Sequence, residues 1–175
     1  MGDGHLDYRQ TNGLVADQVT PTLGTEIVIN GTFAGLADGY DPIGLAQWYA
    51  YGSPSTREIN SERLKLVTGA GNVGIYANFA TTSDNVYKLS CIATGDLGAA
   101  GIYSSTFGTV DTSPGSITKY FIASGSSVII YFRARANTAG TIYYDNVSLK
   151  KVNGNAGVMV SFDGNDFKTD THHSR

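Results

Sequence analysis

The carboxylate of Asp145 lies in a pattern that implies either a buried cap or a metal site. A two-residue period through residues 141–149 places Tyr143, Asp145, Val147 and Leu149 on one face of a strand. Val147 and Leu149 should face the core, so Asp145 is expected to point there too. An isolated carboxylate in a core is costly. Either backbone N–H groups of a neighbouring loop cap it or a Ca²⁺ ion neutralises it, and the spacing alone favours the backbone cap.

Aromatic side chains form a second candidate site. Flat rings present apolar faces that can stack on the C–H groups of a sugar. Trp48 is the single tryptophan, and filling the core is the favoured interpretation for it, with sugar stacking as the alternative. The candidate glycan-binding platform consists of Trp48, Tyr49, Tyr51, Tyr103, Tyr131 and Tyr143.

Residues for nucleophilic or acid–base catalysis are not arranged for that chemistry. The three histidines, His5, His172 and His173, lie near the ends of the chain. A histidine-based catalytic or metal site inside the core is therefore excluded unless a terminal segment folds back. Only positions 26, 58 and 62 are glutamates, and no carboxylate pair has a spacing that indicates a general acid and base. We expect the chain not to be an enzyme.

Two further patterns have simple structural interpretations. Residues 69–74 fit the G-x-G-x-x-G pattern of dinucleotide-binding loops, but that loop requires a following helix. Residues 75–79 alternate like a strand, so the glycines predict a hairpin turn. Cys91, the single cysteine, alternates in phase with Leu89 and is expected to be buried and unreactive.

The elements that must position these residues are short strands. The 22 glycines and the scarcity of glutamate disfavour helices, whereas 41% hydrophobic residues disfavour disorder. We predict an all-β fold, an antiparallel two-sheet sandwich of jelly-roll type, over residues 25–152, with extended arms at 1–24 and 153–175. Alternating runs bounded by Gly, Asn, Asp, Ser or Pro predict strands at 26–30, 47–51, 63–68, 74–81, 86–94, 100–107, 116–123, 127–136 and 141–152.

The charge and hydropathy of the chain exclude two classes of partner. A net charge of −3 provides no basic surface for nucleic acid. The longest apolar run is far shorter than a membrane-spanning segment, so we expect no membrane insertion. The first residues show neither a basic region nor an apolar stretch typical of a signal peptide.

The opening and closing motifs of the predicted sandwich resemble those of carbohydrate-binding-module-like jelly rolls. Such domains open with E-L-V-x-N-G-x-F, continue to a G-W strand and end with Y-x-D-N/D-V-S-L. This chain has E-I-V-I-N-G-T-F at 26–33, Q-W at 47–48 and Y-Y-D-N-V-S-L at 143–149. The resemblance implies one structural Ca²⁺ held by Asp145 together with Glu26. It also implies that the single tryptophan occupies the position that is usually structural.

Domains with these motifs are also similar to modules of bacteriophage virions. This resemblance implies a non-catalytic virion structural protein, most simply a capsid decoration or head-surface component that is made in the host cytoplasm. Its partners would be the major capsid protein or further copies of the chain. The alternative is a glycan-binding module, free-standing or in a tail fibre, that is secreted or binds a cell-surface glycan. Arm-mediated docking would use Leu6, Tyr8, Leu14, Val15, Val158, Val160 and Phe162.

Overall fold

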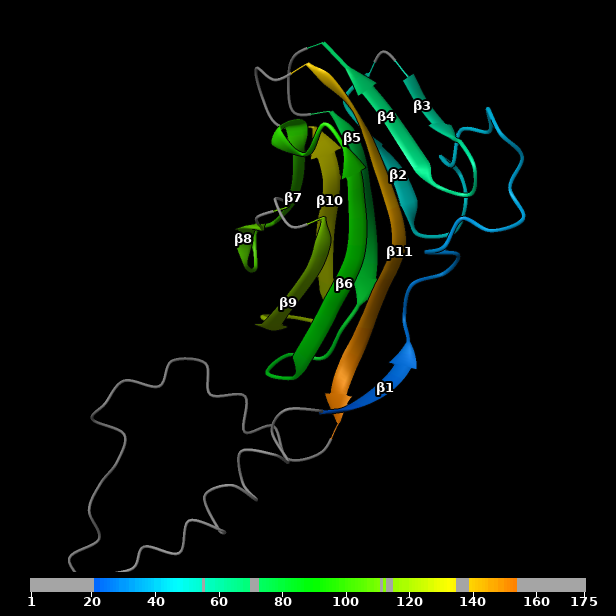
Figure 1. Ribbon diagram of the computed structural model, residues 1–175. Coiled ribbons are helices and arrows are strands. Elements are labelled where there is room, and N and C mark those ends of the chain that lie inside the picture. Colours follow the sequence, from blue (N-terminus) through cyan, green and yellow to red (C-terminus); the bar gives the residue numbers. More distant parts are fainter. Residues whose placement is uncertain are drawn as a thin grey trace, which may run out of the picture. The chain divides into compact units, whose positions relative to one another are not determined.

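The structure is a computed structural model that describes residues 21–54, 56–69, 73–110, 112, 115–134 and 139–153. These residues form strands and a single turn of 3-10 helix (Figure 1). No helix in this part of the chain is long or apolar enough to cross a membrane. The elements are β1 (Thr22–Glu26), β2 (Trp48–Tyr51), β3 (Thr56–Ile59), β4 (Leu64–Thr68), β5 (Gly74–Ala80), β6 (Val86–Gly95), η1 (Leu97–Ala99), β7 (Ala100–Ser104), β8 (Gly108–Val110), β9 (Ser116–Ile122), β10 (Ser127–Ala134) and β11 (Gly140–Asn153).

The strands form two sheets, which confirms the predicted all-β sandwich. One sheet has the order β3-β4-β11-β6-β9, and β1 pairs with β11 in addition. The other has the order β2-β5-β10-β7-β8. The chain passes from one sheet to the other between β4 and β5, and again between β5 and β6. The hairpin turn predicted at 69–74 is therefore wrong, because the strands on its two sides do not pair.

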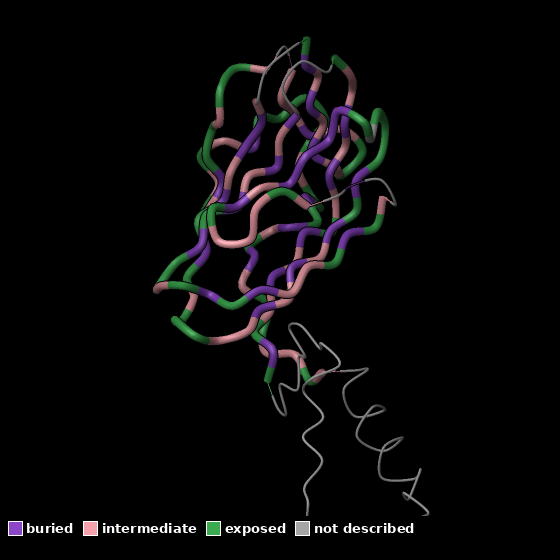
Figure 2. Tube along the Cα trace, turned by 90° about the vertical axis from the view of Figure 1, so that its left-hand side faces the viewer, coloured by how far each residue is buried: buried purple, intermediate pink, exposed green. Residues whose placement is uncertain are grey.

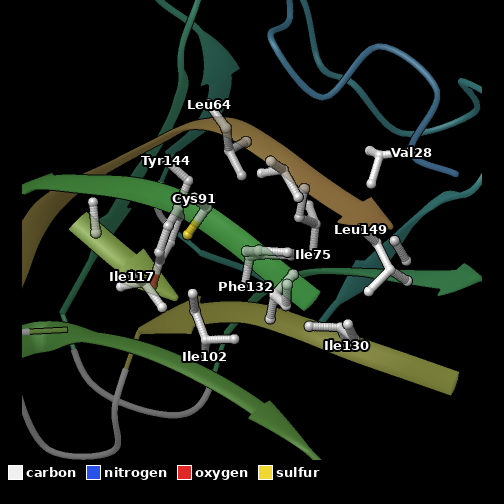
Figure 3. Close-up of a cluster of buried hydrophobic side chains, with 14 of the residues drawn as sticks. Val28, Leu64, Ile75, Cys91, Ile102, Ile117, Ile130, Phe132, Tyr144 and Leu149 are labelled. Carbon is white, nitrogen blue, oxygen red and sulfur yellow. The ribbon is translucent and has the colours of Figure 1, made fainter. Parts of the chain in front are cut away.

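The core lies between the sheets and is built by alternation along each strand. In β10 the side chains of Val128, Ile130 and Phe132 are buried, and those between them are exposed or half-buried. Figure 2 shows the same alternation of buried and more exposed positions along the strands. Figure 3 shows side chains from both sheets meeting in the core, with Cys91 among them. Cys91 is buried, as predicted, and burial raises the pKa of its thiol to about 12.

Strand boundaries differ from the predictions at three places. Strand β1 ends at Glu26, so most of the predicted strand 26–30 is not a strand. Strand β1 also begins earlier than predicted, because residues 22–24, which were assigned to the arm, belong to it. The predicted strand 100–107 ends at Ser104, because residues 105–107 form a turn, and β8 beyond that turn was not predicted. Strand β3 was not predicted from the sequence, because its residues, T-R-E-I, show no clean alternation of apolar and polar residues.

Residues 27–30 are held mainly by side-chain hydrogen bonds, beside one backbone hydrogen bond from the Ile27 N–H to the Leu149 carbonyl of β11 at 3.0 Å. The Gln47 amide accepts a hydrogen bond from the Ile29 N–H at 2.8 Å and donates one to the Ile27 carbonyl at 3.1 Å. Gly31 then passes directly against β11, where its carbonyl accepts a hydrogen bond from the Val147 N–H at 2.9 Å. A Cβ atom on residue 31 would lie 1.9 Å from the Val147 carbonyl oxygen. The glycine of the opening motif is therefore required by this close approach.

A β-bulge in β11 changes which side chains face the core. The register with β6 shifts between Asp145 and Ser148, and Asn146 has a φ of 51°. As a result Tyr144 is buried before the bulge and Val147 after it, whereas Asp145 is half-buried on the outer side. The prediction that Asp145 points into the core is wrong, because a strict two-residue period does not continue through an extra residue.

The buried Tyr144 connects the two sheets. Its hydroxyl, carried by β11, accepts a hydrogen bond from the Gly101 N–H of β7 at 2.9 Å. It donates to the Arg133 carbonyl of β10 at 2.8 Å, and its ring packs edge-on against Phe132 at 5.7 Å. One side chain of the six-stranded sheet thus binds the backbones of two neighbouring strands of the other sheet.

We expect Tyr144→Phe to destabilise the sandwich. The ring still fills its place, but the Gly101 N–H loses a buried partner, which typically costs about 1–3 kcal/mol. Urea unfolding followed by tryptophan fluorescence measures the loss. Tyr143→Phe, at a neighbouring position outside the core, is the matched control and should change the free energy of unfolding little. An equal effect of both substitutions would contradict the inter-sheet role.

Gly31→Ala should destabilise the fold by steric conflict alone. The added methyl group would collide with the Val147 carbonyl oxygen, and a hydrogen bond between the two backbone segments prevents them from moving apart. Gly125→Ala is the matched control, because no atom lies within 4 Å of a Cβ at that position. Thermal unfolding should show a lowered Tm for Gly31→Ala only; an unchanged Tm would disprove the close contact.

Candidate functional site

Four tyrosines form one row across the outer face of the five-stranded sheet. Their Cα atoms are register partners, Tyr49 with Tyr76, Tyr76 with Tyr131 and Tyr131 with Tyr103. The ring centroids of these successive pairs are 5.1, 5.6 and 5.9 Å apart. Because neighbouring strands are about 4.8 Å apart, the row extends about 14 Å across the sheet.

A second row lies at the next outward-facing position of the same strands, two residues away from the first row. It consists of Tyr51, Gly74, Arg133 and Gly101 in register. The Tyr51 ring packs edge-on against Tyr131 with centroids 4.8 Å apart, and the Arg133 guanidinium carbon lies 4.7 Å from the centroid of Tyr103. We call the surface formed by Tyr49, Tyr51, Tyr76, Tyr103 and Tyr131 the tyrosine face.

The hydroxyl groups of the tyrosine face are not used to hold the fold. Within the described ranges, none of the five makes a hydrogen bond to the protein. Tyr87 and Tyr144, by contrast, are buried in the core cluster and use their hydroxyls to bind backbone groups. Tyr49 is also 47% exposed. The tyrosine face therefore offers apolar ring surface together with donors and acceptors that remain available to a ligand.

The outer face of the six-stranded sheet has a different character. Lys65 of β4 forms an ion pair with Glu58 of β3 at 2.7 Å. Further cations lie over single rings, Arg63 over Tyr143 at 4.4 Å and Lys88 over Tyr120 at 5.9 Å. Charged residues are thus distributed over this sheet, whereas a continuous row of rings occurs on the other.

The structure divides the aromatic residues that the sequence had grouped together. Tyr49, Tyr51, Tyr103 and Tyr131 do meet on one surface. Tyr143 belongs to β11 in the other sheet and lies apart from them. Tyr76 was missed, although its alternation with the apolar residues Ile75 and Ala77 indicates an outward position in β5.

Trp48 is part of the core, as the favoured interpretation predicted. It is 1% exposed and packs against Phe33 at 5.3 Å and Phe132 at 5.8 Å between ring centroids. Its indole N–H donates to the Ile29 carbonyl at 3.1 Å. The alternative, sugar stacking by Trp48, would require a ring that reaches the surface.

The architecture matches solved structures. No protein-family model matches the chain, and no curated protein matches it. A structure described as "CBM4 structure and function" superposes with a TM-score of 0.51 at 18% identity, covering 71% of this chain and 99% of that one. The fold is a carbohydrate-binding-module-like jelly roll. This confirms the resemblance of the sequence motifs at the level of the fold.

Two other structures are similar to the chain. An arabinose-bound α-L-arabinofuranosidase gives a TM-score of 0.50 at 16% identity, and the match covers 74% of this chain but only 27% of the enzyme. A family 16 carbohydrate-binding module gives a TM-score of 0.36 at 14% identity, covering 70% of this chain and 98% of the module.

Glu26 caps the junction between the opening segment and β11. One carboxylate oxygen accepts hydrogen bonds from the N–H groups of Ile27 at 3.0 Å, Val28 at 3.1 Å and Leu149 at 2.8 Å. The other accepts a hydrogen bond from the Ser148 hydroxyl and lies 3.8 Å from the Lys150 ammonium. Burial by itself raises the pKa of Glu26, but these hydrogen bonds outweigh it, so the pKa lies below its ordinary value.

The described residues do not fit the calcium site implied by the resemblance. Calcium requires six to eight oxygen ligands, but Glu26 faces N–H and O–H donors and an ammonium group. The Asp145 oxygens accept hydrogen bonds from the backbone and side-chain amides of Asn146. A pocket of about 400 Å³ lies beside Glu26, but Lys150 lines it as well. In the described ranges no three His, Cys, Asp or Glu residues gather as metal ligands.

The proposed arm anchors lie outside the described residues. They are Leu6, Tyr8, Leu14, Val15, Val158, Val160 and Phe162. The bacteriophage decoration role depends on these residues, so it stays a prediction, as do the virion partners and the virion location.

Glu26→Gln should destabilise the fold in a pH-dependent way. Removing the charge weakens the cap, and we expect a loss of about 1 kcal/mol in the free energy of unfolding near neutral pH. Because the folded-state pKa is lowered, this contribution is complete above the unfolded pKa of about 4.3 and is lost as the pH falls through the folded pKa. Urea unfolding over a range of pH should show the two proteins converging in acid.

Two controls define the role of Glu26. Glu58→Gln removes a carboxylate from a surface ion pair and should cost less than about 1 kcal/mol. The loss caused by Glu26→Gln should be the same in calcium as in a chelator. A loss that appears only in calcium would show that Glu26 is a metal ligand and would disprove the cap.

Proposed function

We propose that the chain is a non-catalytic glycan-binding module and that the tyrosine face is its binding surface. The observation that carries the proposal is the row of four register-paired tyrosines with Tyr51 beside it. Apolar ring surface suits the C–H groups of sugars, and the available phenol hydroxyls suit their hydroxyl groups. A row of about 14 Å is long enough to contact several consecutive sugar rings.

The way the surface is built supports this function. Its side chains project from regular strands whose inner faces are packed in the core, so the rings are positioned before any ligand arrives. Tyr131 contacts Tyr51, Tyr76 and Tyr103, which places it at the centre of the surface. An open row of rings suits a polysaccharide chain better than a single small sugar, because a long chain can contact the rings along the whole length of the row.

The fold comparison also supports the proposal. The CBM4 structure belongs to a class named for carbohydrate binding, and the similar enzyme structure contains arabinose. At 18% and 16% identity these likenesses concern the fold. The argument for binding by this chain therefore depends on its own tyrosines.

Tyr131→Ala should abolish most glycan binding. Loss of the central ring removes contacts with the ligand and with three neighbouring tyrosines, and we expect affinity to fall at least about tenfold. Affinity electrophoresis through gels that contain neutral or acidic soluble polysaccharides measures binding of the full chain. Tyr120→Ala, which removes an outward ring from the six-stranded sheet, is the matched control and should behave like the parent.

Different outcomes would contradict the proposed glycan-binding function and the proposed binding site. If the parent protein is retarded by none of the neutral or acidic polysaccharides, the proposed function is wrong. If it is retarded and Tyr131→Ala is retarded equally, the glycan binds elsewhere. Unchanged thermal unfolding of both variants would establish that any loss of binding is local.

A further inference from the structure

Arg133 is the one charged residue in the five strands of the sheet that carries the tyrosine face. Strands β2, β5, β7, β8 and β10 contain no other Asp, Glu, Lys or Arg. The strands of the opposite sheet contain charges of both signs, including Glu58 and Lys65. A single cation thus lies within an aromatic and otherwise uncharged surface.

The guanidinium of Arg133 has no anionic partner in the part of the chain that the structure describes. The ion pairs found there join Arg57 to Asp41, Lys65 to Glu58 and Lys150 to Glu26. The Nε atom of Arg133 is buried and has no hydrogen-bond partner among these residues. Among the described residues, both the charge and the Nε donor of this guanidinium are therefore left without a partner.

The two strands beside β10 place no side chain next to Arg133 at the same register. Its register partners on the two adjacent strands are Gly74 and Gly101, which have no side chains. A side chain at position 74 would lie 2.2 Å from the Phe132 carbonyl oxygen. The guanidinium instead lies over the Tyr103 ring, a cation–π contact that leaves its charge in place. Stacking on one ring still allows the planar edge of the group to bind a carboxylate.

We propose that the tyrosine face binds an acidic polysaccharide and that Arg133 pairs with a carboxylate of its uronic acid units. This inference depends on the proposed glycan-binding function and narrows it to one substrate class. The chain carries a net charge of −3, so its overall charge does not attract a polyanion. Selection for acidic sugars must then come from the local cation, through charge-assisted hydrogen bonds formed next to the stacked rings.

The test measures binding of the full chain to polygalacturonate and to its methyl ester, which has the same backbone with its carboxylates blocked. We expect the parent to bind the acid at least about tenfold more tightly than the ester, as loss of one charge-assisted interaction implies. Arg133→Met should reduce binding of the acid by a similar factor, whereas binding of the ester should not change.

The matched control is Arg63→Met. It removes another arginine, between β3 and β4, that lies over a tyrosine ring of the opposite sheet, and it changes the net charge equally. It should bind polygalacturonate like the parent. Arg133→Lys retains the charge without the planar fork and should bind with intermediate affinity.

Each outcome has a definite meaning. Tyrosine-dependent binding of neutral polysaccharides that Arg133→Met leaves unchanged would overturn the acidic-ligand inference and leave the glycan-binding function standing. Binding of neither neutral nor acidic polysaccharides would overturn both. If Arg133→Met fails to fold, the comparison of acid with ester on the parent still decides, because equal affinity for the two would overturn the inference.

Discussion

A buried tyrosine hydroxyl group links the two sheets of this sandwich across their apolar core. Tyr144 reaches from β11 across the core and satisfies a donor on β7 and an acceptor on β10. Those two strands carry Tyr103, Tyr131 and Arg133 on their opposite side. Buried backbone groups that lose a partner are costly, so the relative position of β7 and β10 is strongly fixed. The strands that carry these outer residues are therefore held from inside by a hydrogen-bonded tyrosine in addition to their own backbone pairing.

The bulge at Asn146 makes this arrangement possible, and the opening motif is fitted to it. Without the extra residue, Tyr144 and Val147 would lie on opposite faces of β11. Gly31 fits against the bulge because it has no Cβ, and Glu26 caps the N–H group of Leu149 just beyond it. The opening motif and the closing motif, at the two ends of the sandwich sequence, thus pack together as one structural unit. The motifs at 26–33 and 143–149 report the fold and carry no information about the ligand.

Alternation in the sequence was sufficient to predict most strands, the two-sheet class and the buried positions of Trp48 and Cys91. The prediction for Asp145 failed because a two-residue period does not reveal an extra residue in the strand. Asn146 is at this bulge and adopts a positive φ. Alternation also failed to group the tyrosines correctly. Which rings meet depends on strand order and register, and these are set by contacts between residues far apart in the chain. Tyr76 became part of the site only once β5 was placed between β2 and β10.

The hydroxyls of the tyrosine face bond to none of the residues that the structure describes, and this affects how the scaffold can change. The core and the hydrogen bonds of Tyr144 hold the sandwich together without any contribution from the hydroxyls of Tyr49, Tyr51 or Tyr131. Residues at these outward positions can be exchanged while the inward residues of the same strands keep the fold. Recognition and stability are therefore encoded by alternate positions of the same strands, and a new specificity can arise without a new architecture.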